Sequence, residues 1–181
     1  MGIGQGELLV TPLQLANSYC AIANKGYYFT PHLVKKIKVK GKFENNQKVD
    51  RKELSVPTYF YNSIIDGLEN VVNNGTAKAS KIPSITLCGK TGTAQNPHGD
   101  EHSIFVGFAP KHNPRIVICC IVENAGTGGS YAAPISSLMI ESYLNDTIAL
   151  KRKVLEKRML DAILLNDTSQ IHRQLLKTNS H

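Results

Sequence analysis

The sequence predicts an α+β domain in which helices pack on one antiparallel sheet. Three segments rich in apolar and β-branched residues, 85–94, 103–109 and 115–123, follow one another along the chain and predict three strands. The second and third are joined by residues 110–114, a connection of hairpin length with a proline at each end. Short links of this kind require antiparallel pairing. Helical patterns before and after these segments supply the helices that cover the sheet.

The first predicted helix begins at Thr11. Thr11 can cap the helix, Pro12 suits its first position, and Gln14 completes a Thr-x-x-Gln capping box. Bulky side chains then recur at helical spacing, and Gly26 is a natural helix end. The sequence therefore predicts one capped helix between Thr11 and Gly26.

The next segment carries much of the positive charge of the chain. Residues 28–40 are predicted to be extended, because apolar and basic side chains alternate between Leu33 and Val39. Residues 41–50 are polar and predict a hairpin or loop. The net charge is +7, but no block of like charges or basic stripe with interleaved aromatic residues is present. We interpret the lysines as a solvated strand face and predict no nucleic-acid partner.

Two further helices flank the predicted strands. The second helix opens at Pro57, carries an apolar stripe and ends at Gly75. The third covers 131–144 and follows a glycine-rich loop at 124–130. Between them, the unbroken apolar run at 116–122 predicts a central strand buried on both faces.

The last part of the chain differs in character from the rest. Residues 146–181 are charged and weakly amphipathic, which predicts one or two peripheral helices and a frayed end. The whole chain has 181 residues, 41% hydrophobic and 19% charged, as is typical of a globular protein with its own core. It holds no run of about 18 apolar residues, so no membrane-spanning segment is predicted.

The cysteines and histidines do not predict a metal site. Four cysteines, none in Cys-x-x-Cys spacing, lie in apolar stretches and are expected to be buried free thiols: Cys20, Cys88, Cys119 and Cys120. Free thiols weigh against a strongly oxidising compartment. His98 and His102 flank Asp100 near the motif described next, so a metal site is an alternative there. Solvated loop residues are the favoured interpretation.

The stretch most informative about function is 88–95, which contains a Gly-Lys-Thr triplet. A phosphate-binding loop needs a glycine five residues before Gly89, where the sequence has Ser84. It also needs a helix that begins at Lys90, but Gly92 and Pro97 follow. A phosphate site is therefore disfavoured.

The second interpretation is the Lys-Thr-Gly box of serine acyl transferases that bind penicillin. This box must be a strand, because the chain has to lie extended beside a bound peptide and pair with it. Gly92 lets the substrate backbone come close. The cation of Lys90 and the neighbouring hydroxyls can meet a carboxylate, and a strand amide can donate to an oxyanion.

Several other segments strengthen this interpretation. Together with Lys90–Gln95, the segments Ile3–Gly6, Thr11–Ala16, Gly75–Ala77 and Phe108–Pro110 resemble the class B penicillin-binding proteins. Within that family the likeness is to elongation-type penicillin-binding protein 2, a monofunctional peptidoglycan D,D-transpeptidase.

The resemblance covers residues 2–145. It implies an incomplete domain of the β-lactamase and transpeptidase fold, with 1–145 as the C-terminal part of the transpeptidase domain. The peripheral tail, 146–181, lies outside the resemblance.

The resemblance also implies roles for four residues. Lys90 would hold the hydrogen-bond network of the active site. Thr91 and Thr93 would bind the carboxylate of a peptidoglycan stem peptide or a β-lactam, and the Thr93 backbone N–H would form one arm of the oxyanion hole. Gly92 would allow close approach. No metal or organic cofactor is implied, and the parent protein would act on the periplasmic face of the bacterial inner membrane.

The sequence departs from the family pattern at the nucleophile. No serine is followed by lysine three residues later, or by asparagine two residues later, so the Ser-x-x-Lys and Ser-x-Asn motifs are absent. Tyr143–Asn145 imitates a Tyr-x-Asn motif but comes after the strand motif, so we treat it as chance. The chain alone is expected to be inactive, with the N-terminal half of the domain missing. A sheet face left bare by that half is expected to drive self-association into a dimer or higher oligomer.

Two alternative functions remain compatible with the sequence. One is a β-lactamase or β-lactam sensor domain, and the other is a non-catalytic binding module of the same fold. The sequence that precedes Met1 would discriminate them from a transpeptidase.

Overall fold

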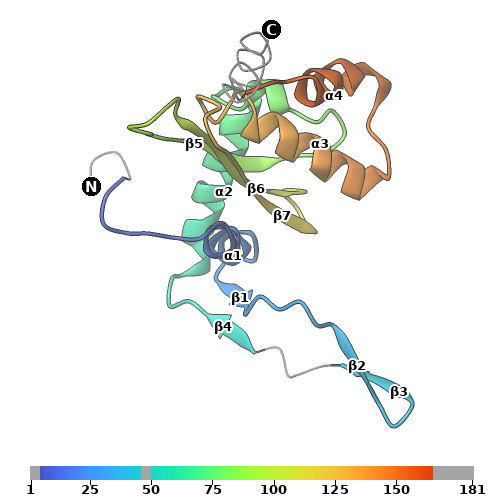
Figure 1. Cartoon of the computed structure of the whole chain (residues 1–181). Coiled ribbons are helices and arrows are strands. Elements are labelled where there is room, and N and C mark those ends of the chain that lie inside the picture. The colour runs from blue at the N-terminus through green and yellow to red at the C-terminus, as the bar shows by residue number, and fades with distance from the viewer. Residues whose placement is uncertain (1–4, 46–49, 165–181) are drawn as a thin grey trace, which may run out of the picture.

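The computed structural model describes residues 5–45 and 50–164, and its centre is a three-stranded antiparallel sheet (Figure 1). The strands are β5 (Cys88–Ala94), β6 (His102–Ala109) and β7 (Ile116–Val122), in the order β5-β6-β7. The predicted three-stranded segment and its antiparallel pairing are confirmed. The first strand begins at Cys88 instead of residue 85, because Ile82 and Ile85 form a small separate bridge before it.

Helices pack on both faces of this sheet, which confirms the α+β class but contradicts the expectation that one sheet face is left bare. Alternate residues of a strand point to opposite faces. Phe105 packs in a cluster with α3 (Ala132–Asn145), whereas Phe108 packs in a second cluster beside α1 (Pro12–Ala23). The third helix, α2 (Thr58–Asn73), contacts β5 and contributes side chains to both clusters.

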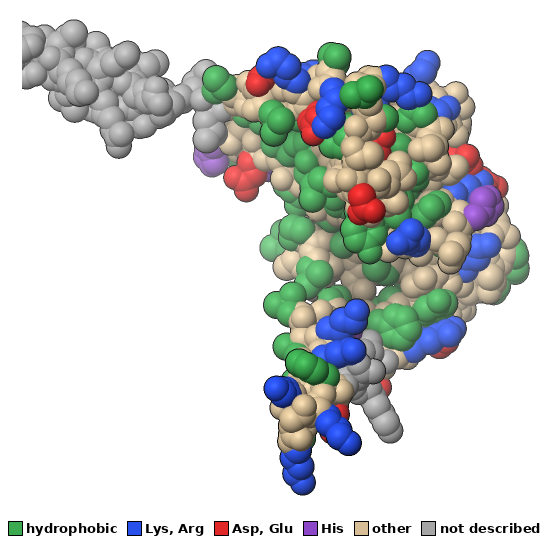
Figure 2. Space-filling view, turned by 90° about the vertical axis from the view of Figure 1, so that its right-hand side faces the viewer, with side chains coloured by type: hydrophobic (Ala, Val, Ile, Leu, Met, Phe, Trp, Pro, Cys, Tyr) green, Lys and Arg blue, Asp and Glu red, His purple; other side chains and the backbone are tan. Residues whose placement is uncertain are grey.

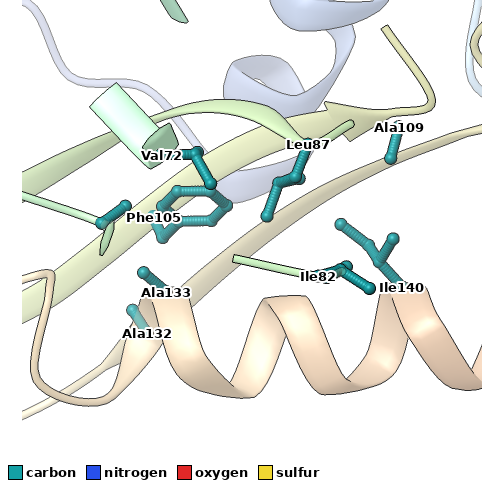
Figure 3. Packing of buried hydrophobic residues seen from close by; sticks show 9 residues of the cluster. Val72, Ile82, Leu87, Phe105, Ala109, Ala132, Ala133 and Ile140 are labelled. Atoms are coloured by element: carbon teal, nitrogen blue, oxygen red, sulfur yellow. The ribbon is translucent and has the colours of Figure 1, made fainter. Parts of the chain in front are cut away.

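The larger cluster surrounds the ring of Phe105, which is fully buried (Figure 3). Val72 from α2 and Ala133 from α3 pack against it together with Leu87. The ring also lies against the backbone, because a Cβ built on Gly89 would be only 2.3 Å from its Cζ atom. A side chain at position 89 would therefore displace the ring that organises the core.

The prediction for residues 116–122 is wrong in one respect. The central strand is β6, whereas β7 lies at the edge of the sheet and is half-buried, with Ile121 40% exposed. Both α1 and α3 contact β7. An unbroken apolar run reports that both faces of a strand are covered, and it carries no information about which strands lie beside it.

The predicted start of α1 is confirmed in detail. The Thr11 hydroxyl accepts a hydrogen bond from the Gln14 N–H at 3.2 Å, and the Gln14 side chain accepts one from the Thr11 N–H at 2.8 Å. This reciprocal capping box satisfies two backbone donors that a helix start leaves free. The helix ends at Ala23, and Gly26 follows with φ of +117°.

The extended segment forms an arm that projects from the helices and the sheet (Figure 1). Strand β1 (Tyr27–Phe29) pairs with β4 (Arg51–Glu53), and β2 (Lys36–Val39) pairs with β3 (Lys42–Asn45). The predicted hairpin is confirmed up to Asn45, while 46–49 lie outside the described residues. Positive φ values at both turn residues, Lys40 and Gly41, suit a tight hairpin. Lysine side chains gather on this arm, as Figure 2 shows.

All four cysteines are free, as predicted. The predicted burial is confirmed for Cys88, whereas the other three are only half-buried. Burial raises the pKa of the Cys88 thiol to about 12, and the same desolvation raises the pKa of Cys20, Cys119 and Cys120.

The chain after α3 forms the short helix η2 (Leu150–Arg152) and α4 (Lys153–Leu160), while residues 165–181 lie outside the described part. This connection is fastened to α3 by a buried ion pair. The Arg152 guanidinium lies 2.5 Å from the Glu141 carboxylate, and it also donates to the Ser137 hydroxyl at 2.6 Å. The side chains of Arg152 and Glu141 are only 6% and 2% exposed.

The ion pair leads to a prediction about stability. Removal of one partner leaves an uncompensated buried charge, so Arg152→Leu should lower the free energy of unfolding by about 3 kcal/mol or more. Addition of Glu141→Leu should restore most of that loss. The measurement is urea unfolding followed by circular dichroism.

A matched control is available at the next residue. Lys153 pairs with Glu156 in an exposed position, so Lys153→Leu should change stability by less than about 1 kcal/mol. Equal effects of Arg152→Leu and Lys153→Leu would contradict the assignment of the buried pair as the anchor.

Candidate active site

The motif Lys90–Thr93 lies on β5, at the edge of the sheet opposite β7. The predicted strand, rather than a helix start, is therefore present at these residues. Among the strands that the structure describes, β5 pairs only with β6. Every second residue of such an edge strand directs its N–H and C=O groups outward. An extended peptide could form backbone hydrogen bonds along this edge.

The side chains of the motif divide between the two faces of the strand. Lys90 and Gly92 share one face, and Thr91 and Thr93 share the other. The Lys90 side chain is exposed, and its ammonium group donates to the Thr91 carbonyl at 2.7 Å. No carboxylate pairs with Lys90 within residues 5–45 and 50–164. Its charge thus remains available to an anionic ligand.

The Thr91 hydroxyl is held by a residue from outside the motif. Its oxygen lies 2.6 Å from the hydroxyl oxygen of Thr76, in the turn that follows α2. Thr91 is 9% exposed, whereas Thr76 is exposed. Thr76 was not among the site residues predicted from the sequence. The only signal was its place in the Gly75–Ala77 segment that resembles the family.

The glycine-rich loop at 124–130 packs directly against the motif strand. A Cβ built on Gly128 would be 2.4 Å from the Gly92 carbonyl oxygen, and one on Gly129 would be 2.5 Å from the Thr76 carbonyl oxygen. Only glycine permits these approaches without a shift of the backbone. The Gly128 N–H also points at the Thr93 hydroxyl over a long 3.4 Å contact.

Ser103 ties this loop to the sheet. Its hydroxyl, which is fully buried, donates to the Thr127 carbonyl at 2.8 Å and accepts from the Ala132 N–H at 3.0 Å. Ser103 lies opposite Thr93 in the strand register. The buried Ser103 hydroxyl therefore connects β6, the glycine-rich loop and the start of α3.

His102, one of the two histidines near the motif, takes part in a small hydrogen-bond network. His102 accepts a hydrogen bond from the Asn124 N–H at its Nδ1 atom, over 3.1 Å. Asn124 in turn accepts from the Asn96 side chain at 2.8 Å. No group of three or more potential metal ligands is found in the part of the chain that the structure describes. These hydrogen bonds link the start of β6 at His102 to the loop after β7 and to the loop after β5. The alternative of a metal site gains no support.

Known proteins resemble this chain in sequence and in fold. The model of the penicillin-binding protein transpeptidase domain matches residues 1–141. The peptidoglycan D,D-transpeptidase MrdA of Haemophilus influenzae is 34% identical over 167 residues, which cover 82% of this chain and 26% of MrdA.

Two solved structures extend the likeness to three dimensions. PBP2 of Pseudomonas aeruginosa is 32% identical with a TM-score of 0.66, and the match covers 83% of this chain and 33% of that one. Penicillin-binding protein A of M. tuberculosis, solved as an imipenem acyl-enzyme complex, is 28% identical with a TM-score of 0.69. That match covers 78% of this chain and 32% of that structure.

The chain thus spans about a quarter of MrdA and about a third of the two solved chains. The match to the transpeptidase domain model extends over most of the sequence. It includes the motif strand, the turn with Thr76 and the glycine-rich loop. The chain therefore belongs to the penicillin-binding protein transpeptidase domain family.

Proposed function

We propose that this chain forms the carboxylate-binding side of the cleft in a serine-type peptidoglycan D,D-transpeptidase. The observation that carries the proposal is the Lys90–Thr93 motif on an edge strand. It carries two hydroxyls and an ammonium group that pairs with no carboxylate of the described residues. Such a strand can pair with an extended stem peptide. Relatives named as peptidoglycan D,D-transpeptidases support the same reaction class.

Each motif residue has a proposed role in acyl transfer. The hydroxyls of Thr91 and Thr93 bind the carboxylate of a stem peptide or β-lactam, since a carboxylate accepts hydrogen bonds and both hydroxyls can donate. The Thr93 N–H serves as one arm of the oxyanion hole. Lys90 holds the hydrogen-bond network of the active site, and Gly92 keeps the strand accessible to the substrate.

The reacting serine belongs to sequence outside this chain. Without Ser-x-x-Lys and Ser-x-Asn, Lys90 has no nucleophile to help activate, so the 181 residues alone are inactive. We assign residues 1–145 to the transpeptidase domain and the remainder to a tail.

The proposed location of the full-length protein is the periplasmic face of the inner membrane, where peptidoglycan is crosslinked. Among the described helices, none is both long and apolar enough to cross a bilayer.

The coding sequence upstream of Met1 and a fluorescent penicillin test the proposed function. We expect a Ser-x-x-Lys and then a Ser-x-Asn upstream in the same reading frame. The full-length protein should be labelled covalently, and a serine-to-alanine change in the Ser-x-x-Lys motif should abolish labelling. The 181-residue chain alone should not be labelled.

Other outcomes would point to the alternatives. An upstream sequence without Ser-x-x-Lys would favour a non-catalytic binding module. Rapid release of hydrolysed penicillin by the labelled protein would favour a β-lactamase. Stable labelling without crosslinking of stem peptides would favour a sensor domain.

We further propose that the isolated chain self-associates through its exposed apolar surface. The outer edge of β7 has no partner strand among the described residues, and Ile121 on it is 40% exposed. The strand carries no charge, so nothing along it opposes pairing with another edge. In the full-length protein, the missing half of the domain would take this place.

Light scattering at micromolar concentration should therefore give a dimer or larger mass for the isolated chain. Ile121→Lys places a charge on the β7 edge and should shift the mass toward the monomer. Leu33→Lys is the matched control, because Leu33 is fully exposed on the arm and its change should leave the mass unaltered. A monomeric mass for the unchanged chain would refute self-association.

A further inference from the structure

The close pair of hydroxyls formed by Thr76 and Thr91 has no counterpart elsewhere in the described motif strand. The two oxygens lie 2.6 Å apart, a short distance even for a hydroxyl–hydroxyl hydrogen bond. By contrast, the Thr93 hydroxyl has only the 3.4 Å contact with the Gly128 N–H. Of the two motif hydroxyls, Thr91 is the one whose orientation is fixed.

The hydrogen-bonding capacity of the pair suits an anionic ligand. Each hydroxyl has one proton to donate, and the contact between Thr76 and Thr91 uses one of the two protons. No other side-chain hydrogen bond of either hydroxyl is found within the residues that the structure describes. One proton is therefore left to donate. A carboxylate, which only accepts, is the complementary ligand.

Thr76 is held in place independently of the motif. The following residue, Ala77, is completely buried, and its N–H donates to the Val71 carbonyl at the end of α2 over 3.1 Å. Gly129 packs against the Thr76 carbonyl oxygen so closely that it has no room for a side chain. The hydroxyl of Thr76 is thus presented to β5 by a rigid turn.

We propose that Thr76 is a positioning residue of the carboxylate-binding site. Its hydroxyl fixes the rotamer of Thr91, so that the remaining proton of the pair is directed at the carboxylate of a bound stem peptide or β-lactam. This inference rests on the proposed function of the motif strand. It adds a residue 15 positions before Thr91, from a different part of the fold.

The test uses the full-length protein that contains this chain. Acylation rates are measured by mass spectrometry with a penicillin as the free acid and as its methyl ester. Thr76→Val removes the hydroxyl and keeps the side-chain shape. It should slow acylation by the acid about tenfold or more, because a hydrogen bond to a charged group is weakened. Acylation by the ester should change less than about twofold.

Two further variants separate positioning from packing. Thr76→Ser restores the hydroxyl and should return the rate with the acid to near the unchanged value. Thr86→Val is the control, since Thr86 is exposed and its side chain makes no hydrogen bond within the described residues. Equal losses with acid and ester in Thr76→Val, or no loss with either, would overturn the proposal.

A binding measurement distinguishes this proposal from the proposed function. If the unchanged protein is not acylated at all, the transpeptidase assignment fails. The role of Thr76 is then tested by equilibrium binding of N-acetyl-D-Ala-D-Ala to the unchanged protein and to Thr76→Val. Binding is monitored through NMR chemical shifts. Weaker binding to Thr76→Val would support the positioning role, and equal or absent binding to both proteins would refute it.

Discussion

The close approach of the glycine-rich loop to the motif strand is the constraint on which the candidate site depends. At Gly128 the loop backbone lies so near Gly92 that a single methyl group would not fit. The same loop contacts the backbone of Thr76 through Gly129 and is fixed by the buried hydroxyl of Ser103. Three segments distant in sequence are thereby brought to one place. The side chains of the motif strand can be held in a defined geometry because the strand packs against the backbone of the loop rather than against adjustable side chains.

Much of the fold could be predicted because its signals are local. The capping box at Thr11 and the turn residues between β6 and β7 involve neighbours in sequence, and both are present in the structure. The order of the strands could not be predicted in the same way, since apolar patterning reports which faces are covered. The site shows the same division. The motif on β5 is visible in the sequence, whereas the contact of Thr76 with Thr91 depends on how α2 ends and where its turn packs.

The packing also shows that η2 and α4, the two short helices after α3, are attached to the rest of the domain. Arg152 reaches into a buried position against Glu141 and Ser137, and both of these residues belong to the helix that begins after the glycine-rich loop. The start of α3 is therefore linked to the glycine-rich loop through Ser103, and residues further along α3 bind Arg152. The division at residue 145 remains a prediction about domain organisation, and the contacts of Arg152 cross it.

The state of the four thiols has a consequence for their reactivity. Only the thiolate attacks a disulfide or a peroxide, and the raised pKa of each cysteine keeps the thiolate fraction low near neutral pH. Cys119 and Cys120 are adjacent in β7 and point to opposite faces, so they are poorly placed to join each other. Exposure of Cys88, the one buried thiol among the four, would require the sheet to separate from the helices that cover it. Folding therefore lowers the reactivity of all four thiols, and it protects Cys88 most because that thiol is buried.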